Sequence, residues 1–426
     1  MLHRLEQLTS SIRVAIIGIG SIGRGMVHQC QLTPSIECVS IADIRLDRAI
    51  ACAEWLQRDY RVVSTLRGMH RAVDQGKLAV CEDGGLLARC ELADVLIEST
   101  NSIGAAGQFA ITTLEHQKHL IMMNAEADLL FGPYLLRLAR QNGLVYSSAD
   151  GDQPVVIGRL IDELRFWGFE LVMAGNIKGY LDRYANPTTI IPEADKRGLD
   201  HKMCTSYTDG TKLCIEMALL ANAFGMRTAV PGMHGPHAVD VHDVFELFDF
   251  DKLWEDRQPV VDYVLGAKPT GGVFAIGYTE DEYQQYTLDW FPPNMGPGPY
   301  YLFYRPYHLG HFESLASVVQ AVLDGRSLLQ PECGFRTNVY AYAKRDLHRG
   351  ERLDGIGGYT CYGLIDNCIQ DDPEPGLPIC LAHDVTLARA VRKDQKIGMG
   401  DIQRDPDRLD FALHSRALEC SSQGPR

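Results

Sequence analysis

The sequence predicts an α/β protein in three parts. Residues 1–150 should form a doubly wound parallel sheet, residues 151–333 an α+β domain, and residues 334–426 a small β-rich domain. In the first part, apolar strand-like runs alternate with helical patterns, which is the rhythm of parallel βαβ units. That rhythm stops near residue 151, and beyond residue 334 short strands and turns dominate.

A glycine-spaced turn follows the first strand, which we expect over residues 14–17. Gly18, Gly20 and Gly23 fit the Gly-x-Gly-x-x-Gly fingerprint. The first glycine permits the tight turn, the second lets the backbone approach a pyrophosphate, and the third lets the helix pack closely on its strand. The spacing therefore predicts a Rossmann-type domain that binds a dinucleotide. The predicted cofactor contacts at the start of the next helix are Ser21 and Ile22.

An acidic residue ends the second predicted strand, residues 36–42. Asp43 lies about 20 residues after Gly23, where a carboxylate can hold the adenosine ribose hydroxyls, and this favours NAD. Arg45 could instead neutralise a 2′-phosphate, so NADP stays open. The alternative for the whole motif is a glycine-rich turn that binds nothing.

The rest of the first domain continues the alternation. The predicted strands are residues 95–100, 119–123 and 144–147, and the predicted helices are residues 49–60, 104–117 and 135–142. Polar residues follow two of these strands, where ligands bind in open α/β sheets. We expect Ser99, Thr100, Asn124 and Glu126 to line the cofactor crevice. Each could equally cap the next helix.

Composition restricts the partners. The 426 residues carry a net charge of -14, 46% of them are hydrophobic, and no basic stripe is present, so nucleic acid and anionic membranes are not expected partners. The 12 cysteines form no Cys-x-x-Cys pair, which favours a cytoplasmic protein with reduced thiols. No apolar run reaches the roughly 18 residues of a membrane helix.

The second domain offers two lysines for carbonyl chemistry. Lys178 follows a strand-like stretch and precedes a Gly-Tyr turn, from which its amine could project into a cleft. The alternative is a solvated surface lysine. Lys212 lies in the first turn of the strongly helical segment 211–224, and Asp209 precedes that segment. We take Lys212 and Asp209, like Lys178, as candidate catalytic residues. The alternative is that Asp209 caps the helix and Lys212 is exposed.

An aromatic-rich loop or strand at residues 300–307 supplies two further catalytic candidates, Arg305 and His308. An arginine could grip a phosphate or a carboxylate bidentately. Its alternative role is a structural clamp among the tyrosines.

Acidic residues after strand ends suggest a metal. Asp150 and Asp152, with Glu126, offer oxygen ligands that suit Mg²⁺ or Mn²⁺, although Asp-Gly-Asp is also ordinary turn chemistry. His234 and His237 have no zinc-ligand spacing with any cysteine, so a structural zinc is not expected.

The last part of the chain resembles itself. Residues 341–353 and 381–391 are similar, and both precede a polar tail that begins near Pro406 and that we expect to be frayed.

Seven segments carry a likeness to a known group, and they span nearly the whole chain. They are residues 123–128 (MNAEAD), 151–154 (GDQP), 209–212 with Glu216 (DGTK), 232–236 (GMHGP), 298–301 (GPYY), 304–308 (YRPYH) and 353–359 (LDGIGGY). In these segments the chain resembles the predicted homoserine dehydrogenases that end in a SAF domain. One branch of that group is similar to deoxyxylulose-phosphate reductoisomerase.

The resemblance implies an oxidoreductase with a SAF-like carboxy-terminal domain. It implies a nicotinamide cofactor, a divalent metal in the reductoisomerase-like branch, and a phosphorylated keto-sugar or another small polyhydroxylated carbonyl compound as substrate. We expect a homodimer or homotetramer. Two alternatives stay open, namely a homoserine dehydrogenase-type enzyme and a nucleotide-sensing or scaffold protein without turnover.

Overall fold

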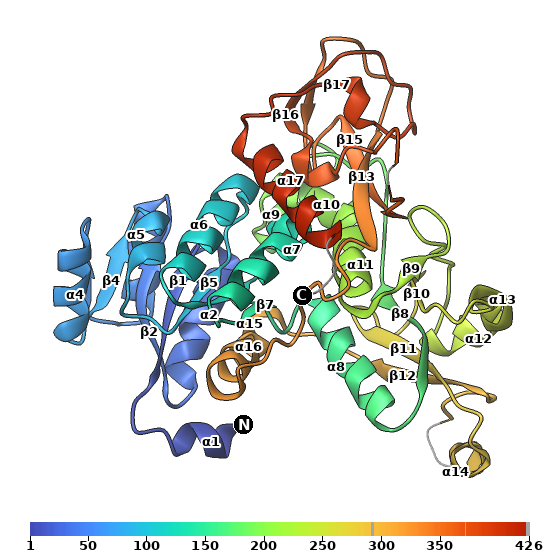
Figure 1. Cartoon of the computed structure of the whole chain (residues 1–426), viewed down its shortest axis with the longest axis horizontal. Coiled ribbons are helices and arrows are strands. Elements are labelled where there is room, and N and C mark those ends of the chain that lie inside the picture. Colours follow the sequence, from blue (N-terminus) through green and yellow to red (C-terminus); the bar gives the residue numbers. More distant parts are fainter. Residues whose placement is uncertain (291–293, 371, 423–426) are drawn as a thin grey trace. The chain divides into compact units, whose positions relative to one another are not determined.

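The computed structural model describes residues 1–290, 294–370 and 372–422 (Figure 1). The chain divides into two compact units. The first unit comprises residues 1–155, 309–330 and 413–420, and the second comprises the rest of the chain. The described residues include no helix that is long and apolar enough to cross a membrane.

The first unit is built on a parallel seven-stranded sheet in the order β3-β4-β2-β1-β5-β6-β7, drawn in blue to teal in Figure 1. Its strands are β1 (Ile12–Ile17), β2 (Ile36–Ala42), β3 (Tyr60–Val62), β4 (Leu78–Cys81), β5 (Val95–Glu98), β6 (His119–Met122) and β7 (Tyr146–Ser148). The order reverses between β1 and β5, so the predicted doubly wound sheet is confirmed, and a crevice is expected at the carboxyl ends of these two strands.

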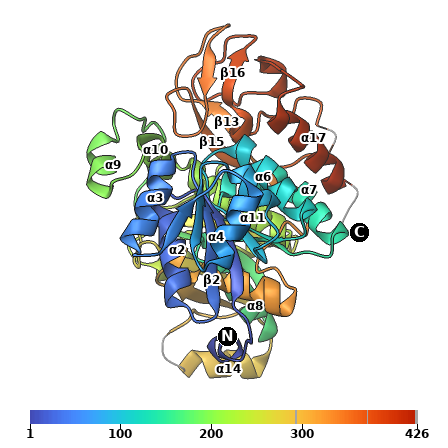
Figure 2. The same ribbon diagram turned by 90° about the vertical axis from the view of Figure 1, so that its left-hand side faces the viewer.

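Helix α1 precedes the first strand and the other helices connect the strands, and Figure 2 views them with α4 toward the reader. They are α1 (Leu2–Glu6), α2 (Ser21–Leu32), α3 (Leu46–Trp55), α4 (Leu66–Asp74), α5 (Gly84–Arg89), α6 (Ile103–Glu115) and α7 (Ala125–Gln141). Helix α7 begins ten residues before the predicted helix 135–142, because the Asn124 side chain accepts a hydrogen bond from the Ala127 amide at 3.0 Å. Pro133 lies inside this helix, where sequence rules expect a break.

Residues 309–330 also pack in the first unit, although the predicted boundaries place them in the second domain. They form α15 (Gly310–Glu313), α16 (Leu315–Val319) and the π-helical turn η2 (Gln320–Asp324). Leu315, Val318 and Val319 are buried in the same core as the strand residues of β1 and β2. The Ser148 amide donates to the Leu329 carbonyl at 2.9 Å. The chain therefore returns to the first unit after most of the second has been built.

The second unit contains a mixed five-stranded sheet in the order β12-β11-β8-β10-β9. Its strands are β8 (Glu170–Lys178), β9 (Arg227–Thr228), β10 (Val260–Leu265), β11 (Val273–Tyr278) and β12 (Tyr300–Arg305). The helices of this part are α8 (Gln153–Phe166), α9 (Ile191–Arg197), α10 (His201–Thr208), α11 (Thr211–Phe224), η1 (Val241–Asp243), α12 (Val244–Leu247), α13 (Phe250–Leu253) and α14 (Glu282–Trp290).

The β-rich part has two small antiparallel sheets, β13-β15 and β14-β16-β17. Its elements are β13 (Thr337–Ala343), β14 (Arg352–Asp354), β15 (Cys361–Asn367), η3 (Ile379–Leu381), β16 (His383–Leu387), η4 (Met399–Asp401) and β17 (Ile402–Gln403). The two similar segments meet here, because Leu347 and Val391 exchange backbone hydrogen bonds of 2.8 and 3.0 Å. Residues 331–412 group with the second unit, so a separate third domain stays a prediction.

The expected frayed tail is wrong for most of its length. Helix α17 (Leu409–Ser422) follows Pro406, and Phe411, Leu413 and Ala417 are buried. The His414 Nδ1 atom lies 3.2 Å from the Leu130 carbonyl oxygen. The burial of these three apolar side chains therefore outweighs the polar composition of the segment. The last four positions of the predicted tail, 423–426, lie outside the described residues.

A buried ion pair fixes the β-rich part to the start of α11. The Lys344 ammonium donates to Asp209 Oδ2 at 2.9 Å and to the carbonyls of Ala185 and Gly358 at 2.6 and 2.9 Å. The side chains of Lys344 and Asp209 are 4% and 0% exposed. All three ammonium hydrogens thus have an acceptor, which is the condition under which a buried cation is tolerated.

We expect Lys344→Ala to lower the free energy of unfolding by about 3–5 kcal/mol, because the Asp209 carboxylate would stay buried without its counter-ion. Urea denaturation measures this change. The double variant Asp209→Asn/Lys344→Met removes both charges and should recover most of the loss. A loss below about 1 kcal/mol in the single variant would contradict a structural role for the pair.

Candidate functional site

The glycine turn of the first unit has the predicted geometry. Gly18 has a φ of +91°, and a Cβ atom there would lie 2.6 Å from the Ser99 carbonyl carbon. A Cβ atom on Gly23 would lie 1.9 Å from the Gly18 carbonyl oxygen. Neither position accepts a side chain without movement of the backbone. At Gly20, in contrast, a Cβ atom would meet nothing within 4 Å, so open space lies beside the turn.

Helix α2 starts at this open space. Gly20 is its N-cap residue and has no side chain to cap the first amides. Ser21 and Ile22 form the first turn and are both exposed. Amides at an uncapped helix start, together with the helix dipole, suit a phosphate group. The turn therefore fits the pyrophosphate of a dinucleotide.

Asp43 connects the second strand to the turn. Its Oδ2 atom accepts from the Ile19 amide at 2.7 Å, and its Oδ1 atom accepts from the Arg45 amide at 2.8 Å. The Arg45 side chain forms an exposed 2.8 Å ion pair with Asp47. Both predicted selectivity residues therefore lie at the carboxyl end of β2, with Asp43 held in place and Arg45 directed to Asp47.

The predicted crevice residues of β5 and β6 support the turn as well. The Ser99 hydroxyl donates to the carbonyls of Ile17 and Gly18 at 2.9 and 2.8 Å. Thr100 directly follows it, and Asn124 caps α7, whose first turn contains Glu126. Asn124 therefore caps the next helix, as the alternative for this residue expects. Capping uses its side-chain oxygen and not its side-chain nitrogen.

One residue of this crevice was not predicted. Glu98 ends β5 and is fully buried, and its Oε1 atom accepts from the Thr100 amide at 3.1 Å. Burial raises the pKa of Glu98 to about 8. Among the described residues, neither Glu98 Oε2 nor Asn124 Nδ2 has a hydrogen-bond partner. A charged residue at the end of an otherwise apolar strand was the available sequence signal.

The metal candidates form turns in the first unit. Asp150 Oδ1 accepts from the Gly151 amide at 2.8 Å, and Asp152 Oδ1 accepts from the Gln153 amide at 3.2 Å. The described part of the chain holds no group of three or more His, Cys, Asp or Glu residues placed to bind a metal. These hydrogen bonds fit the turn alternative, and a metal at Asp150 and Asp152 stays a prediction.

In the second unit, the sheet register gathers polar residues on one face. Arg305 pairs with Val273, Val273 with Asn176, and Asn176 with Tyr263. Residues paired across strands project from the same face, and so do residues two apart on one strand. Lys178 therefore shares the face of Arg305 and Asn176. Neighbouring strands are about 4.8 Å apart, which leaves about 10 Å between the backbones of Arg305 and Asn176.

Asn176 is a residue that the sequence reasoning missed. It is 1% exposed, and its Nδ2 atom has no hydrogen-bond partner among the described residues. Leaving a buried donor unsatisfied costs about 1–3 kcal/mol.

The candidate catalytic residues lie on several elements of the second unit. Lys178 is half-buried at the end of β8. The Arg305 guanidinium lies 4.4 Å from the centre of the Tyr307 ring, and His308 Nδ1 lies 2.8 Å from the Gly271 carbonyl oxygen. Lys212 is 8% exposed, so the alternative of a solvated lysine does not hold for it. Asp209 accepts from the Thr211 amide at 2.9 Å as well as from Lys344.

A histidine–carboxylate pair was also not predicted. His234 Nδ1 lies 2.9 Å from Asp262 Oδ2. Asp262 is buried and also accepts from the amides of His234, Gly235 and Tyr263 at 2.8–3.0 Å. The hydrogen bond from His234 to Asp262 raises the pKa of the imidazole. The carboxylate thereby orients the ring with Nε2 outward, which is the arrangement of an imidazole that exchanges protons.

One family model matches the middle of the chain. Residues 151–314 match the family described as "Oxidoreductase DRL, catalytic domain". This match supports an oxidoreductase and includes Lys178, Lys212, Arg305 and His308. No curated protein matches the sequence.

Solved structures show remote similarity. An NAD binding oxidoreductase from Klebsiella pneumoniae is 16% identical, with 42% of this chain and 45% of that chain covered and a TM-score of 0.32. A DOX-P reductoisomerase in complex with NADPH, fosmidomycin and magnesium is 14% identical (49% and 58% covered, TM-score 0.35). A probable dehydrogenase from Thermotoga maritima is 11% identical (97% and 90% covered, TM-score 0.33). The chain spans about half the length of the first two of these structures.

We expect the protein to bind NADH at least tenfold more tightly than NADPH, because the Asp43 carboxylate would repel a 2′-phosphate. Asp43→Asn keeps a side-chain acceptor for the turn and removes the charge, so it should reduce this ratio of dissociation constants. Titration of both cofactors by fluorescence measures it. A tenfold preference of the wild-type protein for NADPH would assign the selectivity to Arg45 instead.

Glu98 should make stability depend on pH. Its folded-state pKa of about 8 lies above the ordinary value of 4.5, so its contribution is complete below about pH 4.5 and is lost as the pH rises through 8. Relative to Glu98→Gln, the wild-type protein should become progressively less stable between pH 5 and 8 in urea denaturation. The exposed Glu91→Gln is the control. Parallel pH profiles for wild type and Glu98→Gln would show that Glu98 is ionised in the folded protein.

Proposed function

We propose that the protein is an NAD(P)-dependent oxidoreductase that acts on a small, polyhydroxylated carbonyl compound with a phosphate or carboxylate group. One observation carries this proposal: a glycine turn suited to a dinucleotide occurs in the same chain as a segment that matches an oxidoreductase catalytic domain. The open space at Gly20 and the close packing of Gly18 and Gly23 support the cofactor.

A bound reduced nicotinamide supplies a hydride to the carbonyl carbon, and the oxygen must then gain a proton. Lys178 and Lys212 are the proposed proton donors, since an ammonium group can both polarise a carbonyl and protonate the resulting alkoxide. Arg305 is proposed to bind the anionic group in its two-pronged geometry, and His308 to position the substrate beside it. The Arg305–Tyr307 contact supports this role, because the ring fixes the direction of the guanidinium.

Reductoisomerase chemistry is the more specific form of the proposal, and it would add a rearrangement of the carbon skeleton before reduction. A homoserine dehydrogenase-type reaction is its nearest alternative. The SAF-like character of residues 334–426 and the expected homodimer or homotetramer stay predictions.

The test is oxidation of NADH and NADPH at 340 nm with a panel of phosphorylated and carboxylated keto-sugars, followed by analysis of the product skeleton. Turnover with one class of substrate supports the proposal. Tight cofactor binding without turnover on any of them would favour the nucleotide-sensing alternative.

Lys178→Ala and Arg305→Ala should lower kcat/KM without lowering the melting temperature. Loss of a charge-assisted contact costs about 2–5 kcal/mol, which corresponds to about thirtyfold or more in kcat/KM. Lys252→Ala, at an exposed position of α13, is the matched control. Equal losses of activity and stability in Lys178→Ala or Arg305→Ala would instead make that residue structural.

A further inference from the structure

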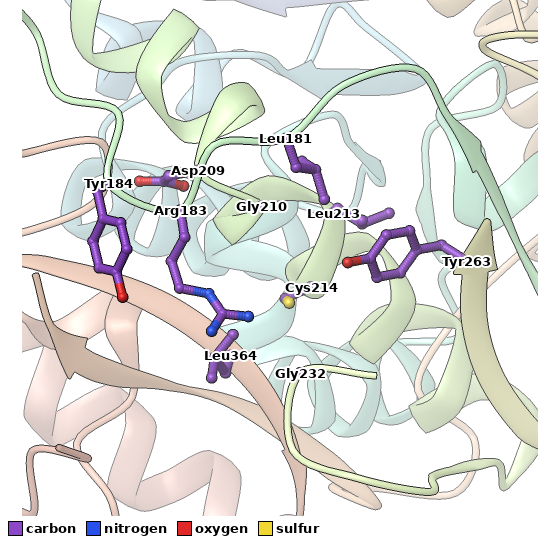
Figure 3. Close-up of a pocket in the computed structure, with 10 residues that line it drawn as sticks. All are labelled: Leu181, Arg183, Tyr184, Asp209, Gly210, Leu213, Cys214, Gly232, Tyr263 and Leu364. Carbon is purple, nitrogen blue, oxygen red and sulfur yellow. The ribbon is translucent and has the colours of Figure 1, made fainter. Parts of the chain in front are cut away.

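The second unit contains a pocket of about 260 Å³ beside the start of α11 (Figure 3). Its walls come from the segment that follows β8, from the beginning of α11, from the β9–β10 connection, from β10 and from β15. The lining residues are Leu181, Arg183, Tyr184, Asp209, Gly210, Leu213, Cys214, Gly232, Tyr263 and Leu364. Of the candidate catalytic residues, Asp209 is among them, whereas Lys178, Lys212, Arg305 and His308, to which the proposed function assigns roles, are not.

Arg183, an exposed residue at the edge of the pocket, gives the pocket its positive charge. Figure 3 shows its guanidinium pointing toward Cys214 and Leu364. Its carbon atom lies 5.4 Å from the centre of the Tyr362 ring, and no carboxylate or carbonyl of the described residues accepts a hydrogen bond from it. A guanidinium presents five N–H donors in a fixed fork that matches a carboxylate or a phosphate. The chain has a net charge of -14. A cation without an acidic partner in such a chain therefore points to a site for an anion.

The carboxylates around the pocket are already engaged. Asp209 accepts from Lys344 and from the Thr211 amide. Asp394 accepts from the hydroxyl of Tyr184 at 2.9 and 3.0 Å and from that of Tyr362 at 2.9 Å. The negative charge of Asp209 is therefore balanced by Lys344, and that of Asp394 is stabilised by two hydroxyl donors. An anionic ligand in the pocket would therefore interact with Arg183, the charged group there that has no partner of opposite charge.

Two further polar groups face the guanidinium. The Tyr263 hydroxyl points into the same space in Figure 3, and burial raises the pKa of both Tyr263 and Cys214 to about 12. Both groups are thus protonated at neutral pH, and the phenol is available as a donor. A Cβ atom on Gly235 would lie 2.0 Å from the Tyr263 ring, so the missing side chain gives the ring its position. Leu181, Leu213 and Leu364 supply apolar walls.

We propose that this pocket binds a small organic anion through a carboxylate or phosphate group. Arg183 contacts the anionic group, Tyr263 donates to it, and the leucines contact its apolar part. The volume corresponds to about eight or nine water molecules, which restricts the ligand to a few carbon atoms. Because the walls combine α11 and β15, a ligand would stabilise the β-rich part against the rest of the second unit.

The experiment is isothermal titration of the full chain with malonate and with inorganic phosphate, each in the presence of saturating NADH. We expect saturable binding of at least one probe, and the preferred probe identifies the ligand class. Arg183→Gln should weaken binding at least tenfold. Arg165→Gln is the matched control, since Arg165 also rests on an aromatic ring, 5.3 Å from the centre of Phe224. It should bind as the wild type does.

Arg183→Lys and Tyr263→Phe keep the test decisive if Arg183→Gln fails to fold. The lysine retains the charge but not the fork, so its affinity should lie between those of the wild type and Arg183→Gln. Tyr263→Phe should weaken binding severalfold, because it removes one donor. No saturable binding of either probe, or equal affinities of wild type and the Arg183 variants, would overturn the proposal. Binding of a probe that occurs only in a parallel titration without NADH would place the anion in the glycine turn and would overturn the proposal as well.

Discussion

The second unit depends on a helix that is buried on every side. All twelve residues from Thr211 to Asn222 of α11 are buried. A helix that is apolar around its circumference needs packed neighbours in every direction, and β10, β13 and β15 pack against α11. Both of its ends are fixed by polar contacts. Asp209 binds Lys344 at the start, and at the end Asn222 Oδ1 accepts from the amides of Arg336 and Thr337 at 2.8 and 2.9 Å.

This constraint ties the β-rich part to α11. Thr211 Oγ1 accepts from the Gly363 amide at 2.8 Å, and a Cβ atom on Gly363 would lie 2.7 Å from Val339 Cγ1. The β-rich part therefore completes the burial of α11. The same contacts create the pocket at Arg183, because Leu364 follows Gly363 on β15.

Local backbone chemistry was predictable from the sequence, and long-range packing was not. The roles of Gly18, Gly20 and Gly23 follow from steric rules within one turn, and the structure agrees with them. Elements that depend on packing partners far away in the sequence were not predicted. Strand β3 has no buried residue to mark it, and α17 is identified by Phe411, Leu413 and Ala417 only once their partners are known. Residues 309–330 could not be assigned to a unit by pattern, since the pattern does not say which core a helix joins.

In the candidate site, too, local chemistry was predictable from the sequence and long-range packing was not. Sequence position placed Lys178 after a strand and Arg305 in an aromatic-rich loop or strand, but only the register shows that they share a face with Asn176. Composition gave Asp209 a chemical role, whereas the structure pairs it with Lys344 and leaves Arg183 as the cation of the pocket. The chain has 55 acidic and 41 basic residues, and a net negative field repels anions at long range. That field is screened within about 8 Å at physiological salt, so an anion that reaches the exposed Arg183 side chain meets mainly the charges beside it. Selectivity for an anion is therefore set by which carboxylates near a cation are already paired, and not by the net charge of the chain.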